Sequence, residues 1–300
     1  MVEDALRAKW PGLKVETRII RTSGDESAAV SGGGKSAAIQ KEPLDPAAGR
    51  KGLFTAEIEQ TLLEGAIDVA VHSAKDLPSV LNAETQIAAV LPRAAVDDVL
   101  VSVNGYDLDS IPRDGVVATG SVRRRHQLLW KRPDLNIVEL RGNVPTRLRK
   151  LKREQWQGAI LARAGLQRLG LVPNGSSVEF EGCEFSASIL PPDVFIPAGG
   201  QGIIAMQIRS KDDQFRMLVE VISDSETQWC LRAEREFLRR LQGDCNQPVG
   251  VFAMVNRDMM TVRGQVFRPG VNTPLEAAIE GNPNDAERLG AELLKRINGQ

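Results

Sequence analysis

Short apolar runs that directly follow helical patterns limit the fold of this 300-residue chain more than any other feature. Residues 57–65 have helical spacing and lead into an apolar run at 67–71, and a similar run returns at 157–162. Strands that are apolar on both faces are typical of sheets covered by helices on both sides. The sequence therefore predicts an α/β fold with a largely parallel sheet.

The order of the remaining patterns predicts two α/β units and a smaller α+β unit. A Pro- and Gly-rich passage at 190–202 indicates a crossover into another apolar strand at 203–208. Alternating strands at 249–255 and 260–267 and a helix at about 285–297 predict the α+β unit. The expected boundaries are 1–91 with 200–220 for domain 1, 97–197 for domain 2 and 222–300 for domain 3.

The first fifty residues depart from a doubly wound unit, which opens on a strand. Here a helical pattern at 2–10 precedes a strand-like segment at 13–20, so we expect the first strand to be missing. Residues 26–50 are rich in Ser, Gly, Ala and Pro, which predicts a mobile lid. Within them Ser31–Ser36 resembles a phosphate-binding loop, but Ala29 stands where the first glycine would be required.

Composition excludes several classes of function. The 38 basic and 39 acidic residues give a net charge of −1, and aromatic content is 4%, which argues against a nucleic-acid binder. No apolar run has the length of a membrane span and the start has no signal-peptide pattern, so we expect a cytoplasmic protein. Three cysteines without C-x-x-C spacing and two histidines argue against a metal site.

Arginines gather where strands of the second unit are expected to end. Arg123, Arg124 and Arg125 follow the turn at 119–121, and a second group follows at 141–149. Guanidinium groups bind carboxylates through two parallel hydrogen bonds and keep their charge, so these groups suit a substrate with several carboxylates or phosphates. A solvated basic face is the alternative interpretation.

Lys75 and Asp76 directly follow an apolar strand, where open α/β sheets bind ligands. A carboxylate beside a cation can stabilise a developing positive charge or transfer a proton. The alternative is a loop ion pair worth less than about 1 kcal/mol. His72, just before them, is expected to be structural.

Cys245 lies alone in a Gly- and Pro-punctuated turn, Leu241 to Gly250. Cysteines in such turns have an exposed sulfur more often than cysteines in apolar runs, and exposure is required for thiol chemistry. Cys245 is therefore a candidate attachment site or nucleophile. A small buried or idle thiol is the alternative.

Taken together, these segments resemble the porphobilinogen deaminase (hydroxymethylbilane synthase) family over nearly the whole chain. The motifs that carry the resemblance are, in order, Lys51–Phe54, His72–Pro78, Ser121–Arg124, Leu140–Val144 with Thr146 and Arg147, Ala164–Gly170, Pro197–Gly202, and the Cys245 loop with the preceding Ala233–Arg235.

The resemblance implies two domains like those of periplasmic binding proteins, with a cleft between them, and a small α+β domain. It implies a transferase of tetrapyrrole and haem biosynthesis, monomeric, that condenses four porphobilinogen molecules into hydroxymethylbilane and releases ammonia. A dipyrromethane cofactor would be joined to Cys245 by a thioether.

The resemblance also assigns roles to individual residues. Asp76 would be catalytic, stabilising the cationic azafulvene left when ammonia departs. The cofactor would be held by Cys245, Lys75, Asp76, Ser121, Arg123 and Arg124. The substrate would be bound by Arg141, Arg147, Arg168, Phe54 and Gln201.

The sequence departs from the family pattern at the missing first strand and around the cysteine. Asp244 and Gln247 replace a small and a β-branched residue, and a carboxylate beside Cys245 is expected to raise the thiol pKa and slow attachment. Gly120 removes a hydroxyl before the arginines. Three alternatives follow: Met1 is an internal methionine of a longer reading frame that encodes the strand, the chain is a degenerate family member, or it is a non-catalytic protein that binds small polycarboxylates.

Overall fold

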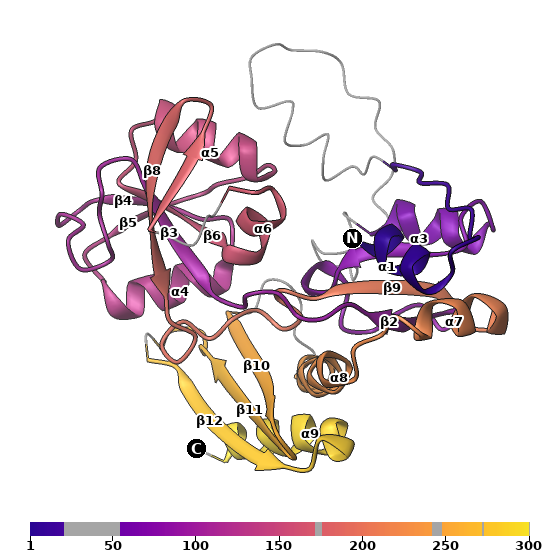
Figure 1. The fold of residues 1–300 in the computed structure, drawn as a ribbon. Coiled ribbons are helices and arrows are strands. Elements are labelled where there is room, and N and C mark those ends of the chain that lie inside the picture. The colour runs from indigo at the N-terminus through magenta and orange to yellow at the C-terminus, as the bar shows by residue number, and fades with distance from the viewer. Residues whose placement is uncertain (21–54, 172–175, 242–247, 272, 300) are drawn as a thin grey trace, which may run out of the picture.

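The structure is a computed structural model, and it describes residues 1–20, 55–171, 176–241, 248–271 and 273–299. Its strands form three sheets, each with its own helices (Figure 1). The predicted lid, Phe54 and Cys245 lie outside the described residues.

The first sheet has the order β1-β9-β2 and is antiparallel at both pairings. Its strands are Ala70–Ser73, Ile204–Arg209 and Thr85–Val90, and the associated helices are α1 (Val2–Lys9), α3 (Ala56–Leu63) and α7 (Asp213–Glu220). Leu6 of α1 and Val219 of α7 pack on Ala89 and Met206 of the sheet. Residues 13–20 belong to no strand, and β1 is an edge of the sheet as described.

The second sheet has the order β5-β4-β6-β3-β8-β7. Its strands are, in chain order, β3 (Asp98–Ser102), β4 (Val116–Ala118), β5 (Asn136–Val138), β6 (Gly158–Ala162), β7 (Ser177–Phe180) and β8 (Cys183–Leu190). Its helices are α4 (Val122–Lys131), α5 (Val144–Arg153) and α6 (Arg163–Arg168). Strands β3 and β6 are buried at every residue because side chains cover both faces.

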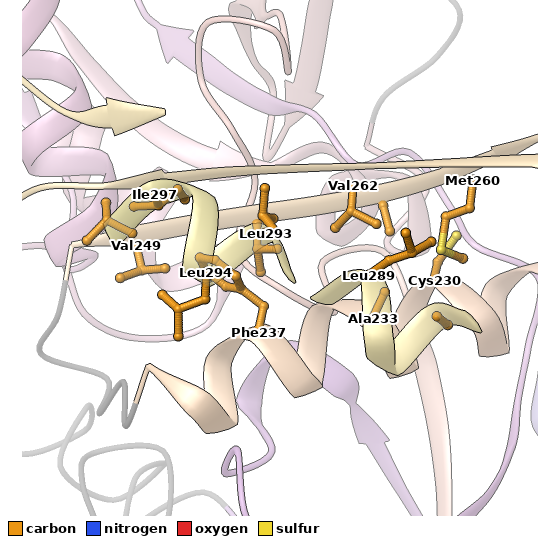
Figure 2. Packing of buried hydrophobic residues seen from close by; sticks show 14 residues of the cluster. Cys230, Ala233, Phe237, Val249, Met260, Val262, Leu289, Leu293, Leu294 and Ile297 are labelled. Atoms are coloured by element: carbon orange, nitrogen blue, oxygen red, sulfur yellow. The ribbon is translucent and has the colours of Figure 1, made fainter. Parts of the chain in front are cut away.

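The third sheet is the antiparallel meander β10-β11-β12, Val249–Asn256, Met259–Val266 and Leu275–Gly281. Helices α8 (Ser225–Arg240) and α9 (Ala286–Asn298) pack on it, and Figure 2 shows Phe237 of α8 close to Leu293 and Leu294 of α9. Leu289, Leu293 and Ile297 all lie in this core, since their spacing of four residues places them on one face of the helix.

The predicted mixed α/β architecture is confirmed, but the prediction of a largely parallel sheet is wrong. Among the described strands, only β5, β4 and β6 pair in parallel; β3 is antiparallel to both of its neighbours, and β9 is antiparallel to β1 and β2. Strands β3 and β9 are each entered by a chain segment that crosses from one sheet to the other, so neither follows a helical crossover that would impose a parallel direction. Seven of the described strands were not predicted from the sequence: β2, β3, β4, β5, β7, β8 and β12.

Candidate functional site

The buried carboxylate of Asp98 is the centre of the candidate site. It accepts hydrogen bonds from Arg123 Nη2 at 2.8 Å and from Arg124 Nη2 at 2.7 Å. Gln201 Nε2 donates to the same carboxylate at 2.9 Å. Burial opposes ionisation of Asp98, but the charges of Arg123 and Arg124 outweigh it and hold the pKa of Asp98 well below its usual range.

Asp98 was missed by the sequence analysis. The only signal was an acidic residue at the start of the apolar run at 99–101, where a charge is costly unless it is paired. The two arginines predicted to bind ligand carboxylates therefore already share an internal carboxylate. Each of them keeps a buried Nε without a hydrogen-bond partner.

Helix α4 places the two arginines side by side. Ser121 is its N-cap, and the Ser121 hydroxyl accepts from the Arg124 backbone N–H at 3.4 Å. From the first turn Arg123 reaches the carbonyl of Ile196 at 2.9 Å, and Arg124 reaches the carbonyl of Ile160 at 3.0 Å. Ser121 therefore serves the helix in this structure.

Lys75 and Asp76 form a short 3₁₀ turn after β1, with Lys75 partly buried. Burial lowers the pKa of Lys75 to about 8; Asp76 acts in the opposite direction, and Arg124 and Arg147 lower the value further. The charged groups that interact here come from segments next to both the first and the second sheet. They form one cluster: Lys75, Asp76, Asp98, Arg123, Arg124 and Arg147.

Arg147 reaches this cluster from α5. Its Nε donates to the carbonyl of Gly142 at 2.6 Å. Burial lowers the pKa of Arg147 to about 10, with Arg124 adding to the effect and Asp76 opposing it. Arg147 thus lies within electrostatic range of the predicted catalytic carboxylate.

The other predicted binding residues are less directly placed. Arg168 donates to the carbonyl of Gly202 at 2.8 Å, and burial lowers its pKa. Gln201 joins the same 200–202 turn to Asp98 and to the carbonyl of Val96. Arg141 is exposed and paired with Glu139 at 2.6 Å, so no contact brings it to the cluster.

The turn at 199–202 holds the Lys75 loop in place. Gly200 has a φ of +78°, and a Cβ there would lie 2.8 Å from the backbone N of Lys75. The Gly200 N–H donates to Glu234 of α8 at 2.6 Å, and Glu234 is paired with Arg93 at 2.6 Å. The Arg93–Glu234 pair was also missed from the sequence. Through Arg93 and Gly200, Glu234 fastens α8 to the two crossover segments, which connect β2 to β3 and β8 to β9.

The cations of this cluster fit a ligand that carries several carboxylates. Within the described parts of the chain Lys75 makes no hydrogen bond or ion pair, and the Arg147 side chain binds only a backbone carbonyl. Partly buried cations without a carboxylate partner are costly, and a polycarboxylate would supply the missing partners. Four cationic side chains face two anionic ones, Asp76 and Asp98.

The two described cysteines, Cys183 and Cys230, lie in different surroundings. Burial, together with the charge of Glu234, raises the pKa of Cys230 to about 12, which disfavours the reactive thiolate. Cys183 is partly buried and lies 2.5 Å from Lys152 Nζ, on the second sheet's edge hairpin. Among the described residues no group of His, Cys, Asp and Glu could hold a metal ion, and no helix could cross a membrane.

Two surface hollows formed by described residues lie away from the cluster. One borders α8 and is lined by Ser79 and Arg235; the other lies beside Trp10 and Met217. Neither hollow is lined by Lys75 or Arg147, so we place the candidate site at the side-chain cluster instead. The predicted cleft and domain boundaries stay predictions.

Comparison with known proteins gives a consistent result. Residues 1–217 match the family model "Porphobilinogen deaminase, dipyromethane cofactor binding domain", and residues 228–299 match "Porphobilinogen deaminase, C-terminal domain". The porphobilinogen deaminase of Roseiflexus sp. strain RS-1 is 43% identical, over 100% of this chain and 91% of its own length. That of Nitrobacter hamburgensis is 41% identical, over 95% of this chain and 82% of its own length.

Solved structures are more distant. YhfZ from Shigella flexneri has a TM-score of 0.30 at 18% identity, with 63% of this chain and 80% of that chain covered. An arginine-specific periplasmic binding protein from Salmonella typhimurium has a TM-score of 0.33 at 12% identity, with 60% and 73% covered.

Proposed function

This chain belongs to the porphobilinogen deaminase family, a family of transferases, and we propose that it is itself a hydroxymethylbilane synthase of tetrapyrrole biosynthesis. It would join four porphobilinogen molecules head to tail and release one ammonia at each coupling. The observation that carries the proposal is the set of partly buried cations without carboxylate partners around Asp76.

A dipyrromethane cofactor, joined through a thioether to Cys245, would supply the pyrrole that starts the chain. Lys75, Arg123 and Arg124 would bind its carboxylates, with Ser121 capping the helix that presents the arginines. The orphaned Nε groups of Arg123 and Arg124 and the unpaired Lys75 ammonium are the donors that fit such a group.

Asp76 would act on the substrate itself. Its carboxylate lies within electrostatic range of Lys75 and Arg147. A carboxylate held in this way can stabilise positive charge on a pyrrole as ammonia leaves, and accept a proton after coupling. Arg147 and Arg168 would bind the acetate and propionate groups of porphobilinogen, assisted by Arg141, Phe54 and Gln201.

The intact mass of the purified chain, before and after exposure to porphobilinogen, tests this proposal. We expect an increase equal to two pyrrole units in the starting chain and in Asp76→Asn, and none in Cys245→Ser. Asp76→Asn should lose at least about 100-fold in turnover, the usual contribution of a positioned acid or base. An unchanged mass in every variant would instead support a non-catalytic binder of polycarboxylates.

We also propose that the protein acts as a monomer in the cytoplasm. Sedimentation of the purified chain should give a single species near its mass of 32.7 kDa. A species of twice this mass would contradict the monomer.

A further inference from the structure

Helix α4, which carries the buried arginines, packs directly against the third sheet (Figure 1). Gln127 Nε2 of α4 donates to Gln265 Oε1 of β11 at 2.6 Å. The rings of His126 and Phe267 lie 5.5 Å apart across the same contact. The third sheet is therefore attached to the arginine-bearing helix by specific polar and aromatic contacts.

The Gln127–Gln265 bond is the middle of a longer hydrogen-bonded chain. Arg123 Nη1 donates to Gln127 Oε1 at 2.8 Å, and Gln265 Nε2 donates to Glu276 of β12. A guanidinium can only donate and a carboxylate can only accept, so the two ends fix the orientation of both amides. Both glutamines are fully buried, where each such bond is stronger and a missing partner is costly.

The same series of hydrogen bonds lies against the start of β10. Gln265 is the register partner of Gly250, and a Cβ at Gly250 would lie 2.5 Å from the carbonyl of Ile196. That carbonyl also accepts from Arg123 and Gln127, each at 2.9 Å. The Val251 N–H donates to the carbonyl of Pro197 at 2.9 Å.

We propose that Gln127 and Gln265 are positioning residues, which hold β10 in one register against Arg123. Strand β10 begins four residues after Cys245 in the chain, so its register fixes one end of the segment that bears the thiol. A one-residue shift of β11 against β10 would turn Gln265, which lies on β11, away from Gln127. This inference rests on the proposed function, in which Cys245 carries a group that the arginines bind.

Exchanging the amide and the carboxylate between positions 265 and 276 tests the proposal. In Gln265→Glu the new carboxylate still accepts from Gln127 but faces Glu276, so the chain is broken by repulsion. Adding Glu276→Gln restores a donor and hence every bond, with the net charge of the original chain. Glu276→Gln alone is the matched control, because its amide oxygen can still accept from Gln265.

Two readouts are measured at a temperature where circular dichroism shows every variant folded. The first is the rate at which the chain gains the mass of two pyrrole units from porphobilinogen. We expect Gln265→Glu to slow it by about tenfold, the factor for one buried hydrogen bond, and the double variant to recover. The second is hydrogen exchange of the Val251 amide, which should accelerate in Gln265→Glu and recover in the double variant.

The outcomes distinguish two claims. The first, the register lock, is that Gln127 and Gln265 fix the register of β10; the second, the positioning role, is that this register speeds cofactor attachment. Unchanged Val251 exchange in Gln265→Glu, or no recovery in the double variant, would overturn the register lock. Altered exchange with an unchanged attachment rate would overturn the positioning role. If the starting chain gains no mass, the proposed function and the positioning role that rests on it fail together, whereas the exchange data still decide the register lock.

Discussion

Asp98 and Arg123 form an ion pair of 2.8 Å in which both side chains are almost completely buried. Arg124 binds the other oxygen of the same carboxylate at 2.7 Å. The first strand of the second sheet is thereby fastened to the helix that carries the candidate ligand-binding arginines. The arginines are thus held in place before any ligand arrives, which lowers the entropy cost of binding.

Asp98→Asn should be strongly destabilising, because it leaves two buried guanidinium groups without a counter-charge. We expect a loss of about 3–5 kcal/mol in the free energy of unfolding, measured by denaturant titration. Asp97→Asn is the matched control: Asp97 pairs with Arg163 at 3.2 Å and is partly exposed, so its loss should cost less than about 1 kcal/mol. Equal losses would contradict the structural role of Asp98.

The ion pairs of Asp98 also predict how the stability of the fold depends on pH. The folded-state pKa of Asp98 lies below its unfolded value of about 3.9, so the unfolded chain binds more protons as the pH falls. The contribution of Asp98 is therefore complete above about pH 4 to 5 and is lost as the pH falls toward the folded-state pKa. Asp98→Asn should lose less stability on acidification than the starting chain does.

Lys75→Met should raise the melting temperature at pH 7 while it weakens cofactor attachment. Because burial lowers the pKa of Lys75 from 10.5 to about 8, the folded chain binds fewer protons than the unfolded chain between these values. Stability therefore rises with pH across this interval, and the rise should be absent in Lys75→Met. Melting curves of the starting chain and of Lys75→Met at pH 7 and pH 9.5 check this. The same change in melting temperature between the two pH values in both proteins would contradict it.

Glu234→Gln should loosen the contact between α8 and the crossover segments. It removes the charge that Arg93 pairs with at 2.6 Å, and we expect a loss of about 3–5 kcal/mol in unfolding free energy. Glu181→Gln, which breaks the exposed pair with Arg149, should change stability by less than about 1 kcal/mol. Chemical denaturation of both variants makes the comparison.

Gly200→Ala should reduce porphobilinogen turnover, because the new methyl group would push against the Lys75 backbone. Gly170 has a similar φ of +67°, but a Cβ there would meet no atom within 4 Å. Gly170→Ala therefore carries only the backbone strain of about 1–2 kcal/mol, without displacing the Lys75 loop. Turnover is compared at a temperature where both are folded; equal activity in the two variants would refute the steric effect.

The local patterns of this sequence determined part of its secondary structure. Helical spacing predicted α1, α3 and α9 to within about two residues at each end, and apolar runs predicted β6 and β9. These elements follow from periodicity, which each segment carries by itself. Position after an apolar strand likewise singled out Lys75, Asp76 and the arginine groups as candidates, whose roles stay predictions.

Tertiary structure alone decided strand direction and which charges are paired. Strands β3 and β9 run antiparallel to their neighbours because the chain crosses between sheets to enter them, and no local pattern encodes that path. Asp98 lies 25 residues before Arg123, and Arg93 lies 141 residues before Glu234. Only folding brings these charges within hydrogen-bonding distance, so the sequence showed the cations but not the carboxylates that hold them.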